Sequence, residues 1–295
     1  MRIGIHIVNF EMQGGVPAIG STLARVGKAV DESGVDNLSV MDHYFQMEMA
    51  GGPEKPMLEG YTTLGFLAAH TTSAELQLLV TGVTYRHPGL LAKIVTTLDV
   101  LSGGRAVLGI GAAWYDREHL GLGVPFPPLG ERFERLEETL QILRQMWSDD
   151  DGAFLGQHYA LAETINVPQS IARPHPPIMI GGTGEQKTLR LVAQYADACN
   201  IFAGPQAGPD FVGAKLEVLQ ERCREVGTDF GRIRKTILWT GPVGTDPDGG
   251  REFVEKMRAF ADVGVDEVHV MPFTDDPVSY VQGVGDNIIG SLSTV

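Results

Sequence analysis

Eight short apolar runs recur along this chain of 295 residues, and stretches with helical periodicity separate them. Continuous apolar runs of this length are typical of parallel strands buried on both faces. Eight such units predict an α/β fold, a closed (β/α)8 TIM barrel that forms one domain over residues 1–295. The predicted strands are Ile3–Val8, Asn37–Met41, Leu76–Thr81, Arg105–Ile110, Pro177–Ile180, Ala198–Phe202, Thr236–Trp239 and Glu267–Met271.

One segment breaks this rhythm. Ser148–Pro176 follows the predicted helix Glu131–Trp147, begins with acidic residues and lacks helical periodicity. We predict an irregular insertion there, with a short hairpin that pairs Ala153–Tyr159 with Ile165–Val167. Long irregular segments often bind ligands, so we expect this insertion and the methionine-rich loop Phe45–Met57 to flank the substrate opening.

Composition narrows the choice of partners. The chain has 37 acidic and 23 basic residues, which argues against binding to nucleic acid or anionic membranes. Its two cysteines, Cys199 and Cys223, have neither a metal-binding nor a disulfide-framework spacing. No signal peptide and no long apolar span is apparent. We therefore expect a cytoplasmic protein. We also expect it to form a homodimer and to act on a small molecule.

Function in such a barrel is expected at the carboxyl ends of the strands. The second predicted strand leads into Asp42 and His43. A carboxylate and an imidazole there can contact a cofactor ring and move protons near pH 7. The alternative is structural: Asp42 caps a turn and His43 is a half-buried spacer.

The third strand is followed by Gly82 and then by Arg86 and His87. A glycine at this place indicates a bulge or the close approach of a ligand to the backbone. Arg86 and His87 precede a helix, whose free N–H groups favour an anion. Alternatively, Gly82 only ends the strand and Arg86 pairs with a surface carboxylate.

Two further strand ends are rich in small residues. Gly109-Ile110-Gly111-Ala112-Ala113-Trp114 would let a flat ring approach the backbone, with Trp114 as a wall or merely as packing for a loop. This is not the G-x-G-x-x-G dinucleotide motif, because Trp114 replaces the third glycine. Gly181-Gly182-Thr183-Gly184 precedes a helix predicted near Glu185, and such a turn binds phosphate or simply turns the chain tightly.

Other chemistries lack their residues. No strand-end lysine is present for a Schiff base, and no metal site or hydrolase nucleophile motif occurs. The remaining features suit a phosphorylated ring cofactor that carries its own redox chemistry. A sugar-phosphate isomerase and a binding protein without turnover are the competing classes.

The chain resembles the bacterial-luciferase-like family of flavin and deazaflavin oxidoreductases, and within it the branch that uses coenzyme F420. The resemblance covers nearly the whole chain. Its most specific motifs are Arg86-His87-Pro88, Leu101-Ser102-Gly103-Gly104-Arg105, Gly109-Ile110-Gly111-Ala112-Ala113-Trp114, Glu118-His119, Gly121, Pro125-Phe126 and Arg132-Phe133-Glu134-Arg135-Leu136-Glu137-Glu138.

The resemblance implies hydride transfer between F420 and a small organic substrate, with Asp42 and His43 near the ring in an acid–base role. It also implies a cis peptide at Gly82-Val83 that backs the ring. The implied cofactor-binding residues are Asp42, Gly82, Val83, Thr84, Arg86, Gly111, Ala112, Gly181, Gly182 and Thr183.

One departure concerns the sugar-phosphate dehydrogenase relatives. They carry a catalytic glutamate where this chain has Trp114, which argues against activity on glucose 6-phosphate. An FMN-dependent monooxygenase and a non-catalytic flavin- or deazaflavin-binding protein remain as alternatives.

Overall fold

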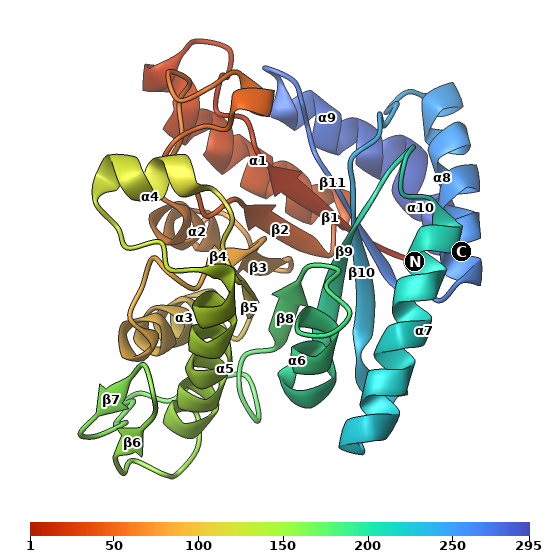
Figure 1. Cartoon of the computed structure of the whole chain (residues 1–295). Coiled ribbons are helices and arrows are strands. Elements are labelled where there is room, and N and C mark those ends of the chain that lie inside the picture. The colour runs from red at the N-terminus through yellow and green to blue at the C-terminus, as the bar shows by residue number, and fades with distance from the viewer.

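All eight predicted strands form, and they pair in parallel around a closed barrel (Figure 1). The structure is a computed structural model that describes residues 1–295. The third barrel position is divided into two short strands that both pair with the fourth, which closes the ring. The barrel strands are β1 (Arg2–Ile7), β2 (Asn37–Val40), β3 (Glu75–Leu78), β4 (Thr81–Gly82), β5 (Ala106–Gly111), β8 (Ile178–Gly181), β9 (Ala198–Ala203), β10 (Arg234–Trp239) and β11 (Glu267–Val270). The predicted TIM barrel is confirmed.

Helices surround the barrel because each presents an apolar stripe to the strands. Helix α1, for example, buries Leu23, Val26 and Val30 and ends at Gly34, whose φ of 76° favours glycine. The helices are α1 (Ile19–Ser33), α2 (Gly60–Ala68), α3 (Pro88–Ser102), α4 (Asp116–Leu122), α5 (Leu129–Met146), α6 (Thr188–Tyr195), α7 (Pro209–Val226), α8 (Pro247–Asp262), α9 (Pro277–Val284) and α10 (Gly290–Leu292), with shorter helical turns at Val16–Ala18, Glu48–Ala50, Phe230–Arg232 and Gly285–Ile289. None of them is long and apolar enough to cross a membrane.

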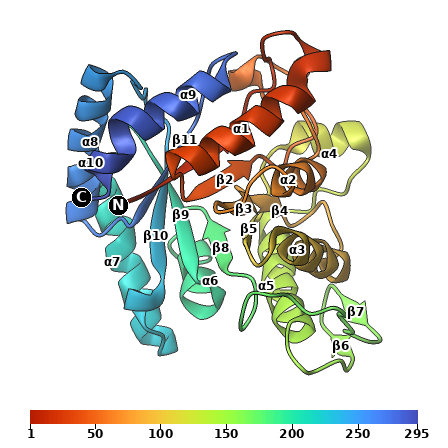
Figure 2. The ribbon, with the colours of Figure 1, turned by 180° about the vertical axis from the view of Figure 1, so that it is seen from behind.

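The two ends of the chain close the ring of helices. Helices α1 and α9 lie side by side in both views of the ribbon (Figures 1 and 2). The amino group of Met1 donates a hydrogen bond to the Leu292 carbonyl at 3.0 Å, so the termini lie close together. The first and last helices of the chain are therefore neighbours in the outer layer.

The insertion occurs where it was predicted, between α5 and β8, but its hairpin pairs differently. β6 (Phe154–Leu155) pairs with β7 (Ala160–Leu161), so the predicted pairing with Ile165–Val167 is wrong. The carboxylate of Glu138 on α5 accepts hydrogen bonds from the backbone N–H groups of residues 157–159. The Glu138 carboxylate thus satisfies the N–H groups of the turn and stabilises a hairpin that is shorter than the predicted one.

The rest of the insertion packs along the outside of α3 and α5 (Figure 1). The Asp99 carboxylate, near the end of α3, accepts hydrogen bonds from the N–H groups of Ile171 and Ala172 at 2.6 and 3.0 Å. These contacts attach the insertion to the helical layer rather than to the carboxyl ends of the strands.

Candidate active site

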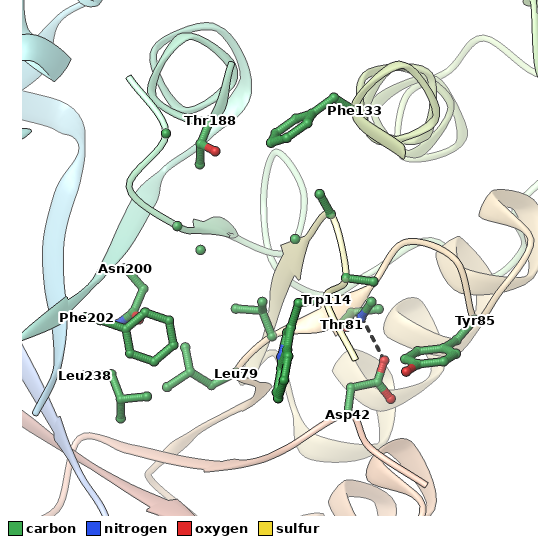
Figure 3. A pocket seen from close by; sticks show the side chains of 18 of the residues that line it. Asp42, Leu79, Thr81, Tyr85, Trp114, Phe133, Thr188, Asn200, Phe202 and Leu238 are labelled. Atoms are coloured by element: carbon green, nitrogen blue, oxygen red, sulfur yellow. Dashed lines mark hydrogen bonds between the residues drawn. The ribbon is translucent and has the colours of Figure 1, made fainter. Parts of the chain in front are cut away.

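A cavity of about 460 Å³ lies at the carboxyl ends of the barrel strands (Figure 3). Its size is within the range of sites that bind small molecules. We call it the mouth cavity. The residues that line it are Asp42, His43, Leu79, Val80, Thr81, Gly82, Tyr85, Gly111, Ala112, Ala113, Trp114, Leu129, Phe133, Gly181, Gly182, Gly184, Thr188, Asn200, Phe202 and Leu238.

Val80 lines the mouth cavity at the place where the chain passes from β3 to β4, and we call its side chain the Val80 ridge. Glycines of the neighbouring strands make room for the bulge of the chain at Leu79 and Val80. A Cβ atom at Gly109 would lie 2.1 Å from the Leu78 carbonyl oxygen, and Cβ atoms at Gly111 and Gly181 would lie 3.0 and 3.1 Å from the Val80 side chain. These glycines therefore accommodate the strand bulge, so that Val80 can face a ligand.

The cis peptide lies in this bulge, between Leu79 and Val80. The prediction of a cis bond at Gly82-Val83 is wrong by three residues. Gly82 is a glycine for another reason: a Cβ atom there would lie 2.7 Å from the ring of Tyr85. Gly82, at which the cis bond was predicted, thus makes room for the Tyr85 side chain.

Asp42, at the end of β2, is buried and already occupied. Its carboxylate accepts two hydrogen bonds from the Arg86 guanidinium, at 2.8 and 2.9 Å, and one from the Gly82 N–H at 2.9 Å. Burial raises the pKa of Asp42, and the charge of Arg86 opposes that rise. Arg86 also donates to Glu59 at 2.6 Å. Its guanidinium is therefore not available to a phosphate, and the alternative of an ion pair holds.

His43, the next residue, has a different partner. Its Nδ1 lies 2.7 Å from Oε1 of Glu118 on α4. Glu118 is fully buried and also accepts a hydrogen bond from the Tyr85 hydroxyl. Burial raises the pKa of Glu118, but the hydrogen bonds from His43, Tyr85 and the Tyr44 N–H outweigh it and hold this pKa below its usual value. The carboxylate that accompanies His43 is thus Glu118.

The glycine turn after β8 forms another side of the mouth cavity. The Gly182 N–H donates to the Asn200 carbonyl, whereas those of Thr183 and Gly184 donate to no acceptor in the chain. Helix α6 begins at Thr188, three residues later than predicted. Free N–H groups in such a turn suit a phosphate oxygen.

The opposite wall is apolar and aromatic. Figure 3 shows Leu79, Leu238 and Phe202 together, with Trp114 between them and Asp42. Trp114 is 57% exposed, and its ring centroid lies 5.4 Å from that of His43. No lysine or arginine lines the mouth cavity, so the wall offers no side chain that would neutralise an anionic substrate.

The structure brings most of the predicted site residues together. Asp42, His43, Gly82, Gly111, Ala112, Gly181 and Gly182 line the mouth cavity, and Thr183 lines the open hollow beside it. Val83, Thr84 and Arg86 do not; they line a separate cavity behind Tyr85. Their assignment to the cofactor site is therefore not supported by their positions.

The expected flanking segments do not reach the opening. No residue of the insertion or of the loop Phe45–Met57 lines the mouth cavity. The loop packs instead against α4, where Glu48 accepts hydrogen bonds from the Tyr115 hydroxyl at 3.0 Å and from Arg117 at 2.6 Å. It supports the segment that carries Trp114 rather than the opening itself.

Sequence reasoning missed several functional candidates. Val80 lay inside an apolar run, and Glu118 lies on a helix beyond the strand-end window. The exposed Phe202, at the end of β9, was a detectable signal, because a large apolar residue at a strand end faces the barrel mouth. Tyr85, Phe133, Thr188, Asn200 and Leu238 also line the cavity.

These features define a class of proteins, closed (β/α)8 barrels with a cavity at the strand ends that an imidazole and a glycine-backed bulge line. The chain belongs to the luciferase-like monooxygenase family, whose model matches residues 1–262. The family predicted from the sequence motifs is thus confirmed.

Relatives within this class use different cofactors. The chain is 32% identical to an F420-dependent glucose-6-phosphate dehydrogenase of Kineococcus radiotolerans over 73% of its own length and 62% of that protein. The match therefore spans less than two thirds of this relative. The chain is also 30% identical, over 43% of its length and 36% of the other's, to an FMNH(2)-dependent dimethylsulfone monooxygenase of Pseudomonas putida.

Solved structures confirm the fold. Coenzyme F420-dependent tetrahydromethanopterin reductase from Methanopyrus kandleri superposes with a TM-score of 0.80 at 17% identity, over 99% of each chain. An F420-dependent secondary alcohol dehydrogenase, solved with an F420-acetone adduct, superposes with a TM-score of 0.78 at 16% identity, over 99% of this chain and 98% of the other.

Proposed function

We propose that this protein is an oxidoreductase that transfers a hydride between deazaflavin coenzyme F420 and a small, uncharged organic substrate. The observation that carries the proposal is the Val80 ridge, which glycines of two neighbouring strands accommodate and which lies in the same cavity as His43. A tricyclic ring can rest on such a ridge with one face open to the substrate. The F420-dependent relatives favour this cofactor.

The cofactor, when bound, supplies the hydride chemistry. In one direction of the reaction the protein donates a proton to the substrate oxygen, and in the other direction it accepts a proton from that oxygen. The protein also excludes water from the reacting atoms. His43 is suited to the proton transfer, because its Nδ1 contacts Glu118 and no group of the chain is hydrogen-bonded to its Nε2. Trp114 and Phe202 provide the apolar cover that lowers the local dielectric.

The glycine turn is the proposed site for the cofactor phosphate. The free N–H groups of Thr183 and Gly184 can donate to it. Lys187 lies in the hollow beside this turn, with its ammonium group 5.4 Å from the centre of the Phe133 ring. Lys215 in the same hollow is already paired with Glu185 at 2.5 Å. Lys187 is therefore the cation that can meet the anionic tail of F420.

The lining of the mouth cavity supports an uncharged substrate. Leu79, Leu238 and Phe202 form one wall, and neither arginine nor lysine lies in the cavity. A second phosphate, on the substrate, would have no cation to meet there. A small alcohol or carbonyl compound fits this wall better than a sugar phosphate.

Side-by-side titrations test the cofactor. We expect F420 to bind more tightly than FMN, and the deazaflavin without its phosphate to bind more weakly than F420. Lys187→Gln should weaken F420 binding several-fold, whereas Lys256→Gln, on the distant helix α8, should not change it. Binding of FMN at least tenfold tighter than F420 would contradict the proposal.

An F420 reduction assay then tests the substrate class. We expect absorbance of the oxidised deazaflavin to fall with small secondary alcohols and not with glucose 6-phosphate. The FMN-dependent monooxygenase relative makes oxygen-dependent turnover with reduced FMN the alternative. Saturable deazaflavin binding with no turnover across a broad panel would instead indicate a binding protein.

A further inference from the structure

We propose that Glu118 is the positioning residue that selects the reactive nitrogen of His43, so that Nε2 exchanges the proton with the substrate. This inference rests on the proposed function, because it assigns His43 a proton to move. The resemblance implied an acid–base role for Asp42 and His43 together; the geometry gives His43 a different carboxylate, 75 positions away.

Three donors and Nδ1 of His43 converge on the Glu118 carboxylate. Oε2 accepts hydrogen bonds from the backbone N–H groups of Tyr44 at 2.7 Å and Phe45 at 3.2 Å. Oε1 accepts from the Tyr85 hydroxyl and lies 2.7 Å from Nδ1 of His43. Such a set of donors stabilises the ionised form of a buried carboxyl group.

An ionised carboxylate can only accept hydrogen bonds. Nδ1 of His43 must therefore carry the hydrogen, and in the neutral ring Nε2 is left with the lone pair. His43 lines the mouth cavity, so this lone pair belongs to the part of the side chain that a substrate can meet. The same carboxylate stabilises the imidazolium that forms when Nε2 accepts a proton.

Asp42 cannot take this role. Both of its oxygens accept hydrogen bonds from Arg86, and one of them also accepts from the Gly82 N–H. The Tyr85 ring, in contrast, is well placed to support Glu118: it stacks on the buried His119 ring with centroids 4.4 Å apart. The two adjacent residues at the end of β2 thus belong to separate networks.

The substitution Glu118→Gln tests the proposal, because the backbone determines how the new amide must lie. The Tyr44 and Phe45 N–H groups require the amide oxygen, which turns the NH₂ group toward Nδ1 of His43. The NH₂ group is a donor, so the hydrogen on the ring should move to Nε2. The substitution therefore reverses the tautomer with little change in shape.

Ring-nitrogen NMR measures the tautomer directly in the protein without cofactor, at a high pH beyond which the ring signals no longer change. The His43 signals are assigned with His43→Gln. We expect the Nδ1–H form in the wild type and the Nε2–H form in Glu118→Gln. Asp116→Asn removes a carboxylate from the exposed side of the same helix and should leave the tautomer and turnover unchanged.

The kinetic readout separates positioning from simple loss of folding. Glu118→Gln should lower kcat by up to about 10⁴-fold, the loss that the equivalent amide substitution causes in a Ser-His-Asp triad, while F420 affinity changes less than threefold. Tyr85→Phe removes one donor from Glu118 and should retain the tautomer with a smaller loss of kcat.

The inference and the proposed function fail in different ways. An Nε2–H tautomer in the wild type, or an unchanged tautomer in folded Glu118→Gln, would overturn the role of Glu118 whatever the cofactor is. If Glu118→Gln does not fold, the wild-type tautomer and Tyr85→Phe still decide. Absence of F420 binding with the expected tautomers would instead overturn the proposed function.

Discussion

The two ends of the barrel both bury charged groups, but they pair them to different degrees. At the amino-terminal end, Glu267 is fully buried and its Oε2 lies 3.1 Å from Nε of Arg2 and 3.4 Å from Nη1 of Arg234. Glu75 lies 3.0 Å from both arginines. With Asp36, 3.5 Å from Nε of Arg2, and His269, 3.1 Å from Oε1 of Glu267, these groups form a cluster of charges at this end.

At the carboxyl end, the charges are paired except at one atom. Arg86 is shared by Asp42 and Glu59, and Glu118 contacts three donors and Nδ1 of His43. Only Nε2 of His43 remains without a partner in this group. The two ends of the barrel thus separate stability from function. We expect the charged cluster around Glu267 to affect folding, and the unpaired Nε2 of His43 to affect turnover.

The largest effect should come from removal of His43, whose Nε2 has no partner in the chain. His43→Ala should lower turnover by about 10²–10⁴-fold and leave F420 affinity similar, because it removes the proton donor or acceptor but not the Val80 ridge. Steady-state rates and a cofactor titration measure this. Turnover within a few-fold of wild type, with any accepted substrate, would remove His43 from the mechanism and end the contrast between the two ends.

The next effect is a loss of stability when the charged cluster around Glu267 is disrupted. Glu267→Gln should lower the free energy of unfolding by about 3 kcal/mol, because it removes the charge of a fully buried carboxylate that lies beside the partly exposed Arg2 and Arg234. Denaturant unfolding measures the loss, and Glu252→Gln, in an exposed pair with Lys256, should change stability by less than about 0.5 kcal/mol. A strong loss of F420 affinity per folded molecule in Glu267→Gln would show that the two ends are coupled.

A third effect is a pH dependence of stability that originates inside the barrel. Burial and the nearby rings of His269 and His43 lower the pKa of His6 to about 3, from an unfolded value of 6.5. Below pH 6.5 the unfolded chain binds a proton at His6 that the folded chain does not. Stability should therefore fall as the pH decreases, by about 2 kcal/mol between pH 6.5 and 4.5.

Substitution of His6 isolates this contribution. His6→Gln should flatten the slope of unfolding free energy between pH 6.5 and 5.5, above the unfolded pKa of 4.5 at which the contribution of Glu267 begins to fall, whereas substitution of the exposed His70 should not. Burial raises the pKa of Glu267, but His269, Arg234 and Arg2 lower it to about 2. An unaltered slope in His6→Gln would show that other groups cause the acid sensitivity.

The smallest effect should come from a change beside Val80 in the mouth cavity. Gly111→Ala would place a Cβ atom 3.0 Å from Val80, which must then shift by a few tenths of an ångström. We expect a normal fold and about fivefold weaker F420 binding, or about 1 kcal/mol. Gly109→Ala is the contrasting variant, because its Cβ atom would lie 2.1 Å from a backbone oxygen and should destabilise the fold. Unchanged F420 affinity in Gly111→Ala would show that the ring does not rest on Val80.

Much of the fold was predictable because a buried parallel strand leaves a strong local signal. All eight apolar runs became barrel strands. The hairpin in the insertion was assigned the wrong partner, since Glu138 on a neighbouring helix determines its turn. The start of α6 was three residues too early, because residues 185–187 form a turn before the helix.

Site residues were predictable from the sequence where the residue type alone, a histidine or a glycine at a strand end, indicates a role. The strand-end windows located His43 and the glycines that line the mouth cavity. They misplaced the cis bond, because the bulge at Leu79 and Val80 is marked by glycines on the next strand rather than by its own residues. The ion pair of Arg86 and the role of Glu118 depend on contacts between distant segments, which local patterns do not encode.

A crystal structure of the protein with F420 tests the central claim most directly. The account predicts the deazaflavin ring on the Val80 side chain, His43 within hydrogen-bond reach of the space above the ring, and the phosphate at the N–H groups of Thr183 and Gly184. A ring bound elsewhere, for example in the cavity behind Tyr85 next to Arg86, would contradict it.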